Sequence, residues 1–145
     1  MGQRYAMMEE IKEQSALLRS LYDGREALCA DFAALYEKHV FKKILFVGNG
    51  SPYYAGCVLR FAAEKLLGAE AESVFAGMFH HHMVFDVSGK FRPEEILLVC
   101  PAESGHSKGQ VDAARRAKAE GCCVMCTTLN PEGVLARSSD VVLAK

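Results

Sequence analysis

The sequence lacks three features that mark common classes of protein. It has no basic excess, because 17 Lys and Arg residues face 18 Asp and Glu residues, for a net charge of −1. Nucleic-acid binding is therefore not expected, since it relies on basic residues that neutralise phosphates. The longest apolar runs, such as Ile96–Cys100, fall far short of the roughly 20 residues that cross a bilayer. Acidic residues and no apolar signal segment near the N-terminus argue against secretion and predict a cytoplasmic protein.

The composition indicates a globular protein with a substantial core. Half of the residues are hydrophobic and 24% are charged. The length of 145 residues fits one domain, for which roughly 100–200 residues are typical. No repeat or low-complexity tract interrupts the chain. We expect residues 41–145 to form the domain and residues 1–40 to form a helical extension.

The six cysteines raise the question of a metal site or a disulfide. Cys123-Val-Met-Cys126 is a C-x-x-C motif, but the surrounding apolar run predicts a buried strand. Side chains alternate between the two faces of a strand, so these two thiols point in opposite directions and cannot share a metal ion or a disulfide. We therefore expect buried, reduced cysteines and no metal or cofactor.

The chain before Phe41 has the spacing of two helices. The apolar residues of the first recur every three or four positions, and Gly24 is a natural stop. The second has one side that is formed by Leu28, Phe32, Leu35, Tyr36 and His39. Apolar residues also stand side by side in the first helix, as Met7 with Met8 and Leu17 with Leu18. This width leaves one face for a partner, and we expect a homodimer whose interface includes the first helix.

The rest of the chain alternates between short apolar runs and helical patterns. Strands are predicted at Lys43–Val47, Glu72–Phe75, Ile96–Cys100, Cys122–Thr127 and Asp140–Ala144. Helices are predicted at Pro52–Leu67, Lys108–Ala119 and Val134–Arg137. In the first of these helices we expect the inward residues to be Tyr54, Cys57, Val58, Phe61 and Leu66, with Gly68 as the C-cap.

Continuously apolar strands that alternate with helices predict a parallel sheet that is covered on both faces. Right-handed crossovers then give an α/β fold: a three-layer α/β/α sandwich with a five-stranded parallel sheet in the order 2-1-3-4-5 and two extra N-terminal helices.

Two Gly/Ser-rich loops follow the first and third strands. Ligands of such sheets bind at the carboxyl ends of the strands, where these two strands are neighbours. In the loop Gly48–Ser51 the glycines allow a tight turn, and we expect Ser51 to cap a helix that begins at Pro52. The loop Ser104–Ser107 opens a second helix, with Lys108 in its first turn. Free N–H groups and helix dipoles that meet at one point favour an anion, although two ordinary capped turns are the alternative interpretation.

Nucleotide motifs do not fit these loops. Tyr53 occupies the third glycine position of a dinucleotide fingerprint, and no P-loop motif occurs in the chain. A phosphorylated small molecule is therefore a better candidate than a nucleotide.

Several segments together resemble the SIS (sugar isomerase) domain family. They are Phe46–Ser51, Glu103–Ser107, Ala117–Gly121 and the late Leu135…Asp140. The leading Met8–Gln14, followed by Leu18-Arg19, is similar to the opening of the isomerase half of glucosamine-6-phosphate synthase and of its ketosamine-phosphate deglycase relatives. The resemblance implies a phosphosugar ligand and an aldose–ketose isomerase, or a deglycase or aminotransferase type of protein.

The resemblance also implies roles for the residues of both loops. Ser51, Ser104 and Ser107 match hydroxyls that hold the sugar phosphate, and Gly50 and Gly105 shape the same pocket. Further residues that could line this pocket are Asn49, Glu103, His106 and Thr127. The chain departs from the family at Ala102, which replaces a serine that binds phosphate, at Glu103, which replaces glutamine or arginine, and at His106, which replaces glutamate, aspartate or asparagine.

No catalytic residue is assigned from the sequence. In the family, the catalytic glutamate and often a ring-opening histidine lie beyond the position that corresponds to Lys145. A shortened enzyme, one part of a divided enzyme and a non-catalytic sugar-phosphate sensor all fit the sequence.

The run His80–His82 is the remaining conspicuous feature. Neighbouring residues on a helix are about 100° apart, so three consecutive imidazoles cannot face one ion; on a strand, only His80 and His82 could. We expect a partly exposed structural run rather than a metal site. A role in ring opening at a neighbouring subunit's pocket is the alternative.

Overall fold

The computed structural model describes residues 6–82 and 84–144, apart from the side chain of His80. The chain divides into two units, Met1–Ala30 and Asp31–Lys145. Helix α1 (Ala6–Asp23) belongs to the first unit, and the predicted stop at Gly24 separates it from α2 (Arg25–Lys38). None of the residues of α1, which all lie in the described part of the chain, is buried. Its exposed apolar side chains include Met7, Met8, Ile11, Leu17, Leu18 and Tyr22.

The second unit holds the predicted sheet. Its strands are β1 (Lys43–Gly48), β2 (Glu70–Phe75), β3 (Ile96–Pro101), β4 (Cys123–Thr128) and β5 (Val141–Ala144). They form a five-stranded sheet in the order β2-β1-β3-β4-β5, and every neighbouring pair is parallel. This confirms the predicted fold class and strand order. In the described part of the chain, no helix is both long enough and apolar enough to span a bilayer.

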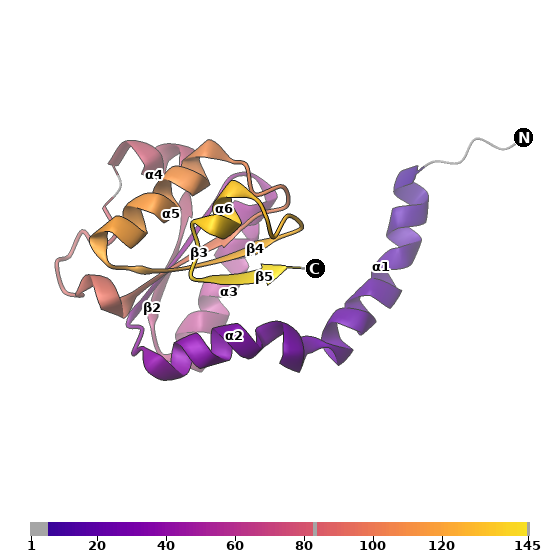
Figure 1. The fold of residues 1–145 in the computed structure, drawn as a ribbon, viewed down its shortest axis with the longest axis horizontal. Coiled ribbons are helices and arrows are strands. Elements are labelled where there is room, and N and C mark those ends of the chain that lie inside the picture. Colours follow the sequence, from indigo (N-terminus) through magenta and orange to yellow (C-terminus); the bar gives the residue numbers. More distant parts are fainter. Residues whose placement is uncertain (1–5, 83, 145) are drawn as a thin grey trace, which may run out of the picture. The chain divides into compact units, whose positions relative to one another are not determined.

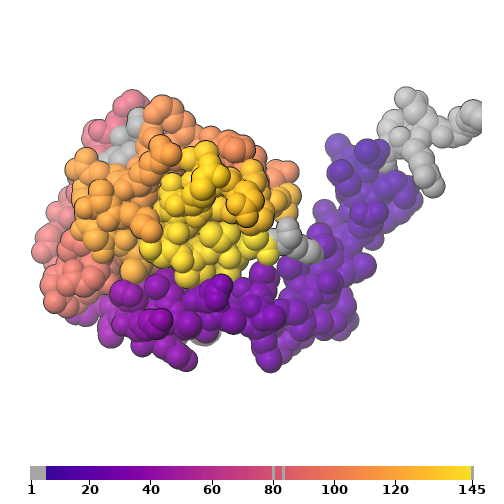
Figure 2. All heavy atoms as spheres, in the orientation of Figure 1, coloured from indigo at the N-terminus to yellow at the C-terminus, as the bar shows by residue number. Residues whose placement is uncertain are grey.

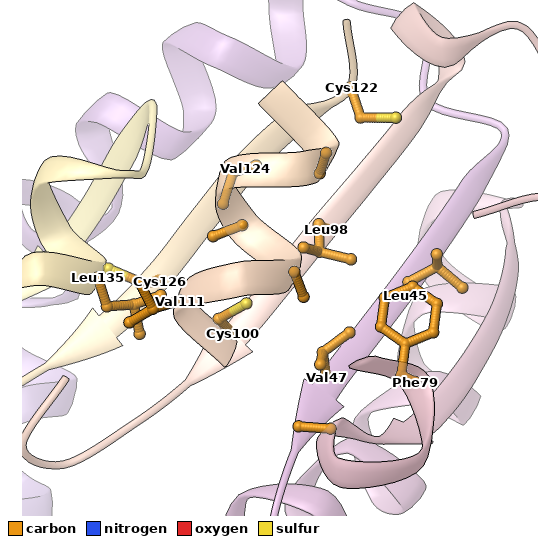
Figure 3. Close-up of a cluster of buried hydrophobic side chains, with 14 of the residues drawn as sticks. Leu45, Val47, Phe79, Leu98, Cys100, Val111, Cys122, Val124, Cys126 and Leu135 are labelled. Carbon is orange, nitrogen blue, oxygen red and sulfur yellow. The ribbon is translucent and has the colours of Figure 1, made fainter. Parts of the chain in front are cut away.

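One face of the sheet is covered by α4 (Ala76–His82), α5 (Lys108–Glu120) and α6 (Val134–Arg137). The sequence predicts the last two of these helices but not α4. Figure 1 shows these helices on one side of the strands, and Figure 2 shows the orange and yellow atoms of α5 and α6 packed side by side. The core beneath them is apolar (Figure 3) and contains Leu45, Val47, Phe79, Leu98, Cys100, Val111, Val124 and Leu135.

The other face is covered by α3 (Ser51–Leu67) and by the part of α2 that belongs to the second unit. Phe32, Leu35 and Tyr36 of α2 pack against this second core, as their helical spacing predicts. The strands supply alternate residues to the two cores, so Ile44 and Phe46 lie here whereas Leu45 lies on the opposite face. A short 3-10 turn, η1 (Pro93–Glu95), leads into β3.

The prediction of which α3 residues face the core is wrong. Its buried residues are Gly56 and Ala63, whereas Tyr54, Val58, Phe61 and Leu66 are exposed and Cys57 is only partly buried. The reason is how closely the helix approaches the sheet: a Cβ on Gly56 would lie 2.6 Å from Ser73 Oγ and 2.7 Å from Phe46 Cβ. Small residues therefore face the sheet, and the large apolar residues point away from it. The helix ends at Gly68, as predicted.

The prediction of buried cysteines is confirmed for Cys100, Cys122, Cys123 and Cys126. Cys123 and Cys126 belong to different cores on opposite faces of the sheet, so the C-x-x-C motif is not a site. Burial raises the pKa of Cys122 to about 12, which keeps this thiol protonated and unreactive. Cys29, in contrast, is exposed, because it lies on α2 rather than in the sheet.

Candidate functional site

The loop after β1 turns sharply into α3. A Cβ on Gly48 would come within 2.7 Å of Pro52 and Tyr53, so the turn requires a residue without a side chain. Gly50 has a φ of 58° and is the N-cap of α3. Ser51 is therefore the first residue of the helix rather than its cap, which corrects the predicted boundary by one residue. Gly50 has no side chain that could cap α3, so the N–H groups of Ser51 and Tyr53 lack a cap from this residue and can serve a ligand, whereas Pro52 has no N–H.

The loop after β3 leads into α5. Ser107 is the N-cap of α5, but its side chain makes no capping hydrogen bond. Gly105 has a φ of 69° and is buried beside Thr128, and its carbonyl accepts a hydrogen bond of 3.2 Å from the Leu135 N–H. The positive φ and the close contact make glycine the residue that fits here. These contacts anchor the middle of the loop to α6 and to the end of β4.

Asn49 joins the two loops. Its Nδ2 lies 3.3 Å from Ser107 Oγ, and its Oδ1 accepts a hydrogen bond of 3.1 Å from the Gly77 N–H at the start of α4. The serine that caps α5 is thus held by a residue from the first loop. Consequently, the beginnings of α3 and α5 are fixed relative to each other at the carboxyl ends of β1 and β3.

Gln110, which was not among the predicted residues, joins the two strands below this point. It is buried in α5, and its Nε2 donates hydrogen bonds to the carbonyl oxygens of Val47, at 2.9 Å, and Pro101, at 2.7 Å. One side chain therefore ties the ends of β1 and β3 together. A signal was present in the sequence, because Gln110, Ala113, Ala114 and Ala117 have the spacing of one helix face and are all buried.

A cavity of about 590 Å³ lies beside these joined loops. The predicted residues Asn49, Ser51, Glu103 and Thr127 line it together. Ala102, which stands where the family has a phosphate-binding serine, also lines it, and the other lining residues, Pro52, Ala55, Pro101 and Leu129, were not predicted for the pocket. The wall formed by the second loop is held to β4, since the Glu103 carbonyl accepts hydrogen bonds from Leu129 N and Thr128 Oγ1, each 3.0 Å long.

The remaining predicted residues lie around this cavity rather than in its lining. Ser107 contacts Asn49, which lines the cavity. Gly50 and Gly105 lie in the backbone turns of the two loops. Ser104 is exposed, and its Oγ accepts a hydrogen bond of 3.4 Å from the backbone N–H of His106. The exposed ring of His106 has its Nε2 3.3 Å from Asn130 Nδ2.

The electrostatics of the cavity come from helix ends, hydroxyl groups and one carboxylate. The positive dipole end of α3 lies at Ser51, and that of α5 lies at Ser107, next to Asn49. Glu103 is the one residue with an ionisable carboxyl group in the lining, which contains no lysine, arginine or histidine. Such a site can hold an anion through N–H and O–H donors, whereas the negative charge of Glu103 would repel the anion.

The histidine run is part of the short helix α4. His81 and His82 are exposed, whereas the side chain of His80 lies outside the described part of the structure. Among the described residues, no group of three or more His, Cys, Asp and Glu side chains could hold a metal ion.

Known proteins share both the sequence pattern and the fold. No protein-family model matches the chain. It is 30% identical to the glutamine–fructose-6-phosphate aminotransferase (isomerizing) of Haemophilus influenzae, in an alignment that covers 95% of this chain and 23% of that protein. The chain is 26% identical to the enzyme of the same name from Symbiobacterium thermophilum, in an alignment that covers 98% of this chain and 24% of that protein. The chain thus spans about a quarter of the length of these curated relatives.

A solved structure of a protein of this type is also similar to the chain. The C-terminal domain of glucosamine-fructose-6-phosphate aminotransferase from Francisella tularensis superposes with a TM-score of 0.74 and 25% identity, over 99% of this chain and 40% of that one. The parallel sheet and the two Gly/Ser-rich loops define an α/β domain of the sugar isomerase type. In sequence and in fold, the chain resembles the SIS domain of the glutamine–fructose-6-phosphate aminotransferases.

Proposed function

We propose that the chain is a phosphosugar-binding domain of a phosphosugar isomerase, ketosamine-phosphate deglycase or aminotransferase type of protein. The observation that carries the proposal is the Asn49–Ser107 contact beside the 590 Å³ cavity. This contact brings the beginnings of two helices to one point, where their N–H groups and dipoles favour a phosphate. The names of the relatives reported above contain fructose 6-phosphate, which belongs to the ligand class that such a site would take.

In this proposal the serines and the backbone anchor the phosphate. Ser51 lies in the cavity lining, Ser107 lies beside Asn49, and Ser104 lies on the outer side of its loop. Gly50 and Gly105 set the turns that expose the N–H groups. Asn49, Glu103, His106 and Thr127 would then contact or surround the sugar.

Calorimetric titration with fructose 6-phosphate tests the proposal. Replacing both Ser51 and Ser107 with alanine should weaken binding and leave the circular dichroism spectrum unchanged. A hydrogen bond to a charged group contributes about 1.5–3 kcal/mol, so each hydroxyl should be worth about ten- to hundredfold in affinity. Ser15→Ala on α1 serves as a matched control and should bind like the parent chain. Unchanged affinity in the double variant would place the ligand elsewhere.

A sugar-phosphate sensor without catalytic activity is the second candidate. The observation that favours it is that the described cavity lining holds no histidine or lysine and only one carboxylate, Glu103, whose charge opposes a bound phosphate. Isomerisation moves a proton between C1 and C2 of the opened sugar and needs a base. Incubation with fructose 6-phosphate or glucosamine 6-phosphate separates the two candidates. Turnover would exclude a pure sensor, and binding without turnover would exclude an enzyme made of this chain alone.

We also propose that residues 41–145 carry the ligand site and that residues 1–40 act as a helical extension. The exposed apolar side chains of α1, such as Ile11 and Leu18, support its participation in a homodimer. Sedimentation of the Leu18→Asp variant tests this role. The variant should associate more weakly than the parent, and equal association of the two would exclude α1 from the interface.

A further inference from the structure

The side chain of Asn49 has a defined orientation, because its oxygen and its nitrogen face different partners. The Gly77 N–H can only donate a hydrogen bond, so the atom that lies 3.1 Å from it is the amide oxygen, Oδ1. The amide nitrogen, Nδ2, therefore faces Ser107 Oγ at 3.3 Å, and an amide nitrogen only donates. It follows that Ser107 Oγ accepts the hydrogen bond from Asn49 and keeps its own proton for another acceptor.

Ser107 lies at a position where a serine side chain normally caps a helix. It is the N-cap residue of α5 and has the extended backbone that is typical of this position. A capping hydroxyl oxygen accepts a hydrogen bond from the N–H of the second or third helical residue, here Gly109 or Gln110. Ser107 makes no such bond, because its Oγ accepts from Asn49 instead. In the described part of the chain, this oxygen has no further hydrogen-bond partner.

We propose that Asn49 is a positioning residue, which holds Ser107 away from the cap of α5 and thereby keeps the start of this helix open to a phosphate. The contact leaves two kinds of donor unused. The Ser107 O–H is one, and the uncapped N–H groups of Gly109 and Gln110 are the other. An ionised phosphate only accepts hydrogen bonds, so it can use both kinds. The role of the phosphate rests on the proposed function, whereas the positioning of Ser107 by Asn49 does not.

Removal of the Asn49 side chain lets Ser107 turn back and cap α5. A bound phosphate must then displace this cap, and a serine cap is stable enough to lower the affinity about fivefold. Donation from Asn49 also polarises the Ser107 hydroxyl and strengthens the hydrogen bond that the hydroxyl itself donates. The Gly77 N–H, by contrast, is exposed, so water replaces Asn49 there at little cost. The effect on binding should therefore depend on Ser107 and not on Gly77.

A double-mutant cycle tests whether Asn49 acts through Ser107. In calorimetric titration with fructose 6-phosphate, Asn49→Ala should weaken binding about fivefold in the parent chain and less than about twofold in Ser107→Ala, which has no hydroxyl to position. Ser107→Thr keeps a hydroxyl, so the fivefold effect should return in this background. Ser15→Ala on α1 is the matched control background and should show the same effect as the parent chain. Asn49→Leu, which has a side chain of similar volume, replaces Asn49→Ala if circular dichroism shows that the alanine variant is unfolded.

The ¹H–¹⁵N NMR spectra of the same variants without sugar give a second readout. Asn49→Ala should shift the N–H resonance of Gly109 or Gln110 in the parent chain, where Ser107 can turn to cap α5, but not in Ser107→Ala. Unchanged resonances in both backgrounds would overturn the proposal, as would an equal loss of affinity in both. A parent chain that does not bind fructose 6-phosphate would reject the proposed function, and the resonances would still decide whether Asn49 holds Ser107 away from the cap.

Discussion

Replacing Gln110 with methionine removes the side chain that ties β1 to β3 and changes little in volume. The Val47 carbonyl is fully buried and loses a donor at 2.9 Å, while the Pro101 carbonyl is half-buried and loses a donor at 2.7 Å. A buried acceptor without a partner costs about 1–3 kcal/mol, and the half-buried one costs about 1 kcal/mol. We therefore expect Gln110→Met to lower the free energy of unfolding by about 2–4 kcal/mol.

Urea unfolding measures this change. With a slope of about 2 kcal/mol/M, the midpoint should fall by about 1–2 M at an unchanged slope. Gln110→Glu should be less stable still at neutral pH, because an ionised carboxylate would face two carbonyl oxygens. Burial raises the pKa of such a carboxyl group, so the variant should regain stability as the pH falls and the group takes up a proton. Gln14→Met, on the exposed helix α1, should change the stability by less than about 0.5 kcal/mol. If Gln110→Met behaves like Gln14→Met, the tie between the strands is not important for stability.

Three further predictions concern α3, the cavity and acid stability. Gly56→Ala should destabilise the fold by about 1–3 kcal/mol in urea unfolding, because the added methyl group meets the sheet, whereas Gly77→Ala, whose nearest neighbour would be at 3.4 Å, should not. Glu103→Gln should strengthen fructose 6-phosphate binding about fivefold in calorimetry, and no change would mean that the carboxylate points away from the ligand. A hydrogen bond from Lys42, together with others from Arg92, lowers the pKa of Glu95 from 4.5 to about 2. The stability that Glu95 contributes should therefore be complete above about pH 4.5 and lost as the pH falls toward 2, and Lys42→Met should flatten this dependence in acid unfolding curves.

The sheet could be predicted from the sequence because buried parallel strands are apolar on both faces. Runs such as Ile96–Cys100 are too short for transmembrane helices and too continuously apolar for surface strands, and the handedness of the connections then fixes the strand order. The short helix α4 was missed because seven residues with three consecutive histidines carry no clear helical period.

The face of α3 that packs on the sheet could not be predicted from its hydrophobic pattern. Hydrophobic spacing identifies Tyr54, Val58 and Phe61 as one face, and such a face normally packs on the core. Here Gly56 and Ala63 face the sheet, because the helix approaches too closely for larger side chains. This distance depends on the tertiary structure, so the pattern alone misleads.

The candidate site was partly predictable. The two loops follow from their glycines and serines, and the topology rule brings them together at the end of the sheet. The hydrogen bonds of Asn49 and Gln110, by contrast, join residues that are 58 and 63 positions apart in the chain, and local patterns do not encode such contacts. The shift of the α3 cap from Ser51 to Gly50 reflects a backbone conformation that glycine permits.

The central claim is that a sugar phosphate binds where the helices α3 and α5 begin. Two-dimensional ¹H–¹⁵N NMR of the chain during titration with fructose 6-phosphate, and with fructose as the control, tests it most directly. The account predicts saturable shifts of the backbone N–H groups of residues 49–51, 53, 54 and 104–109 with the phosphorylated sugar, and no comparable shifts with fructose. Shifts in other regions, or equal shifts with both sugars, would contradict the account.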